Sequence, residues 1–139
     1  MAEQMAPTLT VLSAQSRPVA WDAAATLEKL EGLVRMHRRV FPQVDLYLFP
    51  ELFLTGDDPW TLGPPDFLHR VAEKIPGPLT EWLGALAAKT RRWLCAGSVA
   101  ERAGRKLHNT ALCSTPRAGW WCGTGRSSRG CRTREWIVG

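Results

Sequence analysis

The fold of this 139-residue chain is decided by one stretch, Val44-Asp-Leu-Tyr-Leu-Phe-Pro-Glu-Leu-Phe-Leu-Thr-Gly-Asp57. Residues 46–49 form a short continuous apolar run, which is typical of a β-strand covered on both faces. Pro50 has no amide hydrogen for a strand ladder, so the strand should end there and place Glu51 just beyond its carboxyl end. Ligand sites of open α/β sheets lie outside such strand ends. Glu51 is therefore the candidate functional residue, and the alternative interpretation is an ordinary loop or helix-capping acid.

The residues before this stretch predict one strand and one long helix. Residues 8–14 have the apolar side chains of a first strand, and Gln15 follows it. Asp22 is a typical N-cap, and apolar residues recur at three- and four-residue spacing from there to about Val40, which predicts an amphipathic helix packed on the sheet. His37, near the cationic end of this helix, is expected at the surface. The expected inward-facing residues are Leu27, Leu30, Leu33, Val34 and Met36.

The residues after this stretch predict two further helices and a β-hairpin. Pro76-Gly-Pro78 separates the two helices, because proline and glycine interrupt helical structure. His108, within the last strand, is expected to be a half-buried structural residue. The expected elements are a short helix over 66–75, a second helix from a Thr80 cap to about Thr90, and strands over 93–99 and 107–113 joined by a polar turn over 101–106.

The loop over residues 55–65 and the cysteines give no sign of a metal site. Asp57 and Asp58 are interpreted as solvated turn acids, because no third ligand recurs near them. Trp60 is a possible pocket wall or an anchor of the loop. The four cysteines, Cys95, Cys113, Cys122 and Cys131, show no Cys-x-x-Cys pair and no histidine cluster, which argues against zinc. Cys95 and Cys113 are expected to be small buried residues in a reducing compartment. No metal or organic cofactor is expected.

The composition is that of an ordinary globular domain, with 45% hydrophobic and 22% charged residues. No apolar run approaches the length of a membrane span, and the first residues lack a secretory signal, so a cytoplasmic location and no membrane partner are expected. Residues 118–139 hold four arginines, one glutamate and no lysine, so they account for three of the five excess positive charges. A nucleic-acid partner for the rest of the chain is therefore not expected.

Several motifs resemble the carbon–nitrogen hydrolase (nitrilase) superfamily. Phe-Pro-Glu-Leu-Phe-Leu-Thr-Gly, residues 49–56, resembles its first catalytic motif. The strand that ends at Gln15, the phrase Ile75-Pro-Gly-Pro-Leu-Thr80 and the pair Ala96-Gly-Ser98 with Leu107-His-Asn-Thr-Ala111 are also similar to it. The resemblance covers residues 8–116, about the first half of the family domain.

The resemblance implies an α/β fold, the N-terminal half of a four-layer α-β-β-α sandwich, in a protein that forms a homodimer or higher oligomer. It also implies hydrolysis of a small amide, carbamoyl or nitrile substrate by a Glu-Lys-Cys triad. Glu51 matches the glutamate, which acts as general base. Gln15, Phe53 and Trp60 are expected to be structural residues around it.

The pattern departs from the family towards the end of the sequence. No lysine follows Lys106, and neither Cys122 nor Cys131 lies in a matching context, so the lysine and cysteine roles are unfilled. We therefore expect a partial hydrolase domain over 8–116 and an unrelated, disordered tail over 117–139. The tail has the Trp, Cys, Gly and Arg content of a GC-rich gene read out of frame. When each third codon base is joined to the next two bases, with permitted wobble choices, residues 119–134 can encode a segment containing Tyr-Arg-Lys.

Two interpretations of the function follow. In the first, the chain is a truncated, inactive hydrolase fragment whose natural domain continues further. In the second, it is a small binding protein whose basic, tryptophan-rich tail contacts nucleic acid or an acidic partner. Salt-sensitive binding of oligonucleotides that is lost when residues 117–139 are deleted would favour the second.

Overall fold

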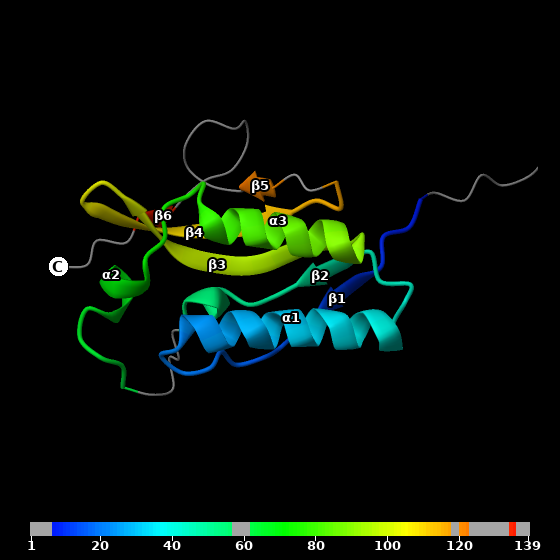
Figure 1. Ribbon diagram of the computed structural model, residues 1–139, viewed down its shortest axis with the longest axis horizontal. Coiled ribbons are helices and arrows are strands. Elements are labelled where there is room, and N and C mark those ends of the chain that lie inside the picture. The colour runs from blue at the N-terminus through cyan, green and yellow to red at the C-terminus, as the bar shows by residue number, and fades with distance from the viewer. Residues whose placement is uncertain (1–6, 57–61, 118–119, 123–133, 136–139) are drawn as a thin grey trace, which may run out of the picture.

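The computed structural model describes residues 7–56, 62–117, 120–122 and 134–135 (Figure 1). These residues form one sheet and a layer of helices, as the sequence predicts. In chain order the elements are β1 (Val11–Ser13), α1 (Ala23–Val40), β2 (Leu46–Leu48), the 3-10 helix η1 (Phe53–Thr55), α2 (Phe67–Val71), α3 (Pro78–Thr90), β3 (Trp93–Ala103), β4 (Lys106–Ser114), β5 (Trp120–Cys122) and β6 (Arg134–Glu135).

The strands are ordered β1-β2-β3-β4-β5 in the sheet, and β6 also pairs with β4. The first three strands are parallel, with Val11 opposite Leu46 and Leu46 opposite Trp93, while β3 and β4 form an antiparallel hairpin. The helices α1 and α3 connect the parallel strands and lie on the same face of the sheet (Figure 1). Right-handed crossovers that advance in one direction along a sheet produce this arrangement.

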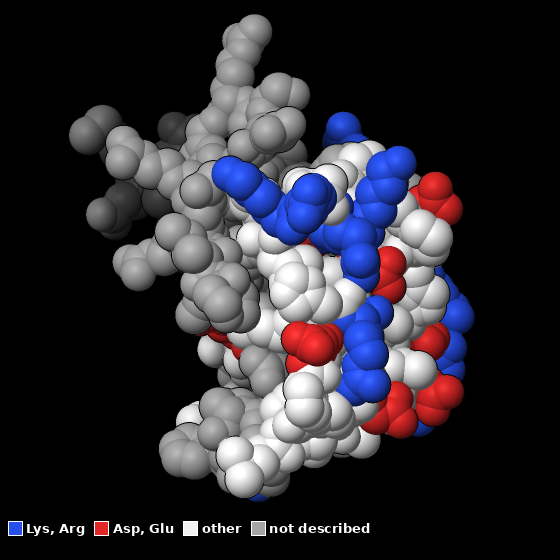
Figure 2. All heavy atoms as spheres, turned by 90° about the vertical axis from the view of Figure 1, so that its left-hand side faces the viewer, with Lys and Arg blue, Asp and Glu red and all other residues white. Residues whose placement is uncertain are grey.

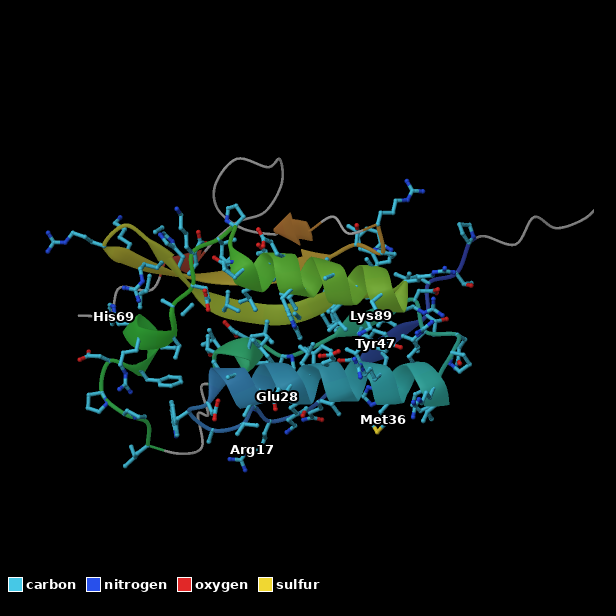
Figure 3. The ribbon with its side chains drawn as sticks, viewed as in Figure 1. Arg17, Glu28, Met36, Tyr47, His69 and Lys89 are labelled. Atoms are coloured by element: carbon cyan, nitrogen blue, oxygen red, sulfur yellow. The ribbon has the colours of Figure 1, made fainter. Side chains whose placement is uncertain are left out.

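The core lies between the sheet and these two helices. Leu30 and Val34 of α1 pack there with Tyr47 of β2, and all three are fully buried. Figure 3 shows Tyr47 between α1 and the strands. Leu83 of α3 and Leu94 of β3 complete the centre of the same cluster. Burial of one such side chain stabilises a fold by about 1.5–3 kcal/mol, so these side chains hold the two helices on the sheet.

The opposite face of the sheet has no helix over it among the described residues. Four apolar residues on or beside its parallel strands remain between 41% and 62% exposed, namely Leu9, Val11, Leu48 and Trp93. Among the described residues β2 is covered on one face only, because α1 and α3 both lie on that face, so the predicted cover on both faces is not met there. Cys95 and Cys113 were expected to be buried; they lie on this helix-free face and are half-buried.

The helix α1 confirms the predicted N-cap but not every predicted inward residue. Asp22 Oδ1 accepts a hydrogen bond from the amide of Ala25 at 2.9 Å. Met36 was expected inside but is 49% exposed and projects away from the sheet (Figure 3). Met36 follows the buried Val34 by two residues, and two residues correspond to a rotation of about 200° around the helix, so the two side chains point in nearly opposite directions. His37, expected at the surface, is half-buried and stacks on Tyr47 at a ring separation of 6.5 Å.

Three other boundaries differ from the predictions. The helix predicted over 66–75 is shorter and spans only α2. The turn predicted over 101–106 is also shorter, because Glu101 and Arg102 belong to β3 and pair with His108 and Leu107 of β4. Thr80 is the third residue of α3 rather than its N-cap. Its hydroxyl accepts from the Gly77 amide at 3.0 Å and donates to the Gly77 carbonyl at 2.7 Å. No helix in the described part of the chain is long and apolar enough to cross a bilayer.

Most of the predicted tail, residues 117–139, lies outside the described residues. Two short pieces of its backbone are described, and both pair antiparallel with β4: β5 lies opposite residues 112–114, and β6 opposite residues 108 and 109.

Candidate active site

Glu51 stands on a turn just beyond the carboxyl end of β2, as the sequence predicts. Its side chain is exposed, whereas the residues around it anchor the turn in the core. Leu52 adopts a left-handed backbone conformation, with φ of 52°, and leads into η1. Phe53, at the start of η1, is fully buried and stacks on Phe49 at 5.4 Å. Phe53 therefore supports the turn that carries Glu51.

Asn109 of β4 reaches this turn from a distant part of the chain. Its Nδ2 atom donates a hydrogen bond to Glu51 Oε1, which joins two motifs 58 residues apart. Asn109 alternates with Ala111 and Cys113 on the helix-free face, whereas Thr110 and Leu112 are buried under the helices. The carboxylate of Glu51 is thus held at the helix-free face of the sheet.

Asn109 also leaves an acceptor unused. Its Oδ1 atom is buried and has no hydrogen-bond partner within the described chain. A buried amide oxygen without a donor costs about 1–3 kcal/mol, so this atom is an acceptor available to a donor placed beside Glu51.

Gly97 explains why Ala96-Gly-Ser98 accompanies the Glu51 motif. The pairing of β3 with β4 shifts between Cys95 and Ser98, which marks a β-bulge. Gly97 has φ of +82°, and a Cβ atom built on it would lie 1.8 Å from the carbonyl oxygen of Pro50. The turn before Glu51 therefore packs directly on a backbone position that only glycine can occupy.

Ser98 holds the other side of the same turn. Because the bulge changes the alternation of β3, Cys95 and Ser98 both lie on the face of Cys113 and Ala111, their partners in β4. Ser98 Oγ accepts a hydrogen bond from the amide of Leu52 at 2.9 Å. The orientation of Glu51 thus depends on contacts from both strands of the hairpin.

We expect the substitution Ser98→Ala to loosen this turn. It leaves the Leu52 amide without its acceptor, which should lower the free energy of unfolding by about 1–3 kcal/mol. Amide hydrogen exchange at Leu52 should accelerate, as measured by NMR or mass spectrometry. The control is Ser16→Ala, whose hydroxyl makes an exposed contact with the Arg17 carbonyl at 3.4 Å. Unchanged protection of Leu52 in Ser98→Ala would contradict the assigned contact.

The structure gives less information about the remaining predicted site residues. Gln15 is exposed and follows β1, where the amide of Ala14 donates to the Leu48 carbonyl at 2.8 Å. Trp60, Asp57 and Asp58 lie outside the described residues. Within the described ranges, no group of three or more His, Cys, Asp or Glu residues could hold a metal ion.

The surface at the hairpin end of the molecule carries both signs of charge. Figure 2 shows Lys and Arg side chains gathered there in a band, with Asp and Glu side chains beside them. The exposed basic Arg70 and Arg105 are accompanied in this region by the exposed acidic Asp66 and Glu73. A surface of mixed sign gives little general attraction for a polyanion.

Comparison with known sequences identifies relatives of one kind. The family model described as carbon-nitrogen hydrolase matches residues 10–128. A bifunctional nitrilase/nitrile hydratase of Lupinus angustifolius is 32% identical in an alignment of 120 residues that covers 77% of this chain and 34% of that protein. The chain therefore spans about a third of the length of this curated relative.

Comparison with solved structures gives the same fold. XC1258 of Xanthomonas campestris, a CN-hydrolase superfamily protein, aligns with 86% of this chain and 41% of its own, with a TM-score of 0.65 at 23% identity. Nit3 of Saccharomyces cerevisiae, a nitrilase superfamily member, aligns with 84% of this chain and 44% of its own, with a TM-score of 0.66 at 18% identity. The predicted fold, the N-terminal half of a four-layer α-β-β-α sandwich, is confirmed by these likenesses.

Proposed function

Because this chain belongs to the carbon–nitrogen hydrolase family, we propose that it supplies the general base, Glu51, of a site that hydrolyses a small amide, carbamoyl or nitrile substrate. The observation that carries this proposal is the convergence of three distant segments on one carboxylate. The β2 turn presents Glu51, the β3 bulge makes room for that turn, and Asn109 of β4 binds Oε1.

The geometry suits a base that must keep one oxygen free. Asn109 occupies Oε1, so Oε2 can take a proton from a nucleophile and later from water. In the reaction that the family resemblance implies, a cysteine attacks the substrate carbon and a lysine stabilises the oxyanion. The unpaired Oδ1 of Asn109 would accept a hydrogen bond from a cationic donor placed beside Glu51.

The cysteine and lysine roles are not matched within the 139 residues. We propose that both belong to a continuation of the domain, in a reading frame that leaves the present one near residues 116–119. The apolar residues exposed on the helix-free face support a further layer of structure over that face. The chain also covers only 34% of the lupin relative, which agrees with a longer complete domain. The complete form would be a homodimer or higher oligomer, as the family resemblance implies.

We expect the purified 139-residue chain to be inactive and to self-associate. Without a nucleophile the covalent route is lost, which costs orders of magnitude in rate. The helix-free face, with its exposed leucine, valine and tryptophan side chains, favours association between copies. The measurements are ammonia release from simple amides and nitriles, and light scattering during size-exclusion chromatography. A monodisperse monomer that hydrolyses amides would contradict this expectation.

The gene sequence tests the missing residues directly. The genomic DNA is re-read from the codon of Leu112 through several hundred bases beyond that of Gly139. A missing or additional base near codons 115–119, followed by a frame that encodes Tyr-Arg-Lys and a later cysteine, would support a complete hydrolase. Confirmation of the present frame would overturn the proposed change of frame and would make the alternative of a binding protein with a basic tail worth testing.

A further inference from the structure

Cys95 of β3 and Cys113 of β4 face each other across the hairpin. They are directly opposite in the antiparallel register, and their Sγ atoms are 2.6 Å apart. Both side chains are half-buried on the helix-free face. A disulfide bond joins sulfur atoms about 2.05 Å apart, so little movement would be needed to form one here.

The backbone geometry of this pair is also suitable. The carbonyl of Cys95 accepts the amide of Phe49 at 2.9 Å, so it points towards β2 and away from β4. Cys95 and Cys113 are therefore a non-hydrogen-bonded pair, in which the Cα atoms lie about 4.5 Å apart and the side chains approach closely. Disulfide bonds span Cα separations of about 4.4–6.8 Å.

The two thiols differ in acidity. The hydrogen bond between the two thiols lowers the pKa of the Cys95 thiol, whereas that contact and burial raise the pKa of the Cys113 thiol. The thiolate is the species that attacks disulfides, so the contact between the two thiols helps one member of the pair to react.

We propose that Cys95 and Cys113 form a redox-active dithiol that small-molecule disulfides oxidise to a cross-strand disulfide. The thiolate of one cysteine attacks one sulfur of the small disulfide, forms a mixed disulfide and releases one thiolate. The thiol of the other cysteine then loses its proton to solvent and attacks the protein sulfur of the mixed disulfide, which releases the second thiolate. Two protein thiols are oxidised and one disulfide is reduced to two thiols, so atoms and electrons balance.

The site lies next to the bulge that supports the Glu51 turn, because Cys95 precedes Ala96 and Gly97 directly. The proposal does not depend on hydrolase activity, and it concerns the 139-residue chain, in which no helix covers this face among the described residues. Oxidation would fix β3 to β4 beside the position where their pairing shifts, so the cross-link would restrain the bulge.

The test is incubation of the reduced full chain, at low protein concentration, with oxidised glutathione, followed by peptide mapping under non-reducing conditions. The expected product is a linked pair of peptides containing Cys95 and Cys113, without glutathione on either. The same incubation in concentrated urea is the control, and there the bridge should be distributed among all four cysteines. A dominant bridge through Cys122 or Cys131 in the folded chain, or stable glutathione adducts on Cys95 and Cys113, would overturn the proposal.

Two matched variants test whether each thiol resolves the mixed disulfide of the other. Cys113→Ser should accumulate glutathione on Cys95, and Cys95→Ser should accumulate it on Cys113, because each variant lacks the resolving thiol. The absence of glutathione from the remaining cysteine in both variants would overturn the proposal, and peptide mapping of the unsubstituted chain tests the bridge itself even if a variant fails to fold.

Discussion

The substitution Gly97→Ala should remove a large part of the stability of this fold. The added Cβ would lie 1.8 Å from the Pro50 carbonyl oxygen, a backbone atom that cannot move without displacing the turn that carries Glu51. The left-handed conformation of residue 97 adds about 1–2 kcal/mol for any residue with a Cβ, and overpacking adds about 1–3 kcal/mol. The expected loss of about 2–5 kcal/mol is a large part of the 5–15 kcal/mol that typically stabilises a domain.

Gly104→Ala is the matched control for this prediction. Gly104 also has a positive φ, +65°, but nothing lies within 4 Å of the position of its Cβ. This variant should lose only the conformational part, about 1–2 kcal/mol. The measurement is the midpoint of urea unfolding at low protein concentration, together with soluble yield. Equal destabilisation of the two variants would show that the contact with Pro50 does not constrain residue 97.

In the catalytically complete form of the protein, Glu51→Gln should reduce kcat about 10²–10⁴-fold, the usual contribution of general base catalysis. Glutamine keeps the shape of the side chain and can still accept the hydrogen bond of Asn109, but its amide cannot take a proton. The structure around the site should therefore persist while the chemical step slows. Steady-state kinetics should show a fall in kcat with little change in KM.

The control for Glu51→Gln is Glu28→Gln, which replaces an exposed carboxylate on α1. This variant should keep the kcat of the unsubstituted enzyme. The rate of cysteine alkylation adds a second readout, because removal of the base should also slow ionisation of the nucleophile. Activity within twofold of the unsubstituted enzyme in Glu51→Gln would eliminate the proposed role of Glu51.

The position of Glu51 could be predicted because its cause is local. An apolar strand that ends at a proline must deliver the next residue beyond the sheet, and the structure places Glu51 there. The N-cap of α1 could be predicted for the same reason, because Asp22 binds an amide three residues away. Local patterns were less informative about how deeply a side chain is buried. Met36 has the spacing of an apolar helix face, but it lies outside the part of that face that contacts the sheet and is exposed.

The partners of Glu51 could not be predicted because their causes lie far away in the chain. Asn109 reaches Glu51 only when β4 has paired with β3, and Ser98 reaches Leu52 only when a bulge shifts that pairing. A glycine within a strand is the single sequence signal for such a bulge. The contact between Cys95 and Cys113 depends on the same register, so composition and spacing alone suggested only two buried apolar residues.

The strand order of the sheet bears on how the protein is made. From β1 to β5, the strands have the same order in the sheet as in the chain, so each strand pairs with the edge formed by the strand before it. None of these five strands has to insert between two that are already paired. A ribosome releases about 5–20 residues per second, so each strand emerges after the strand with which it pairs. Assembly can therefore follow the order of synthesis.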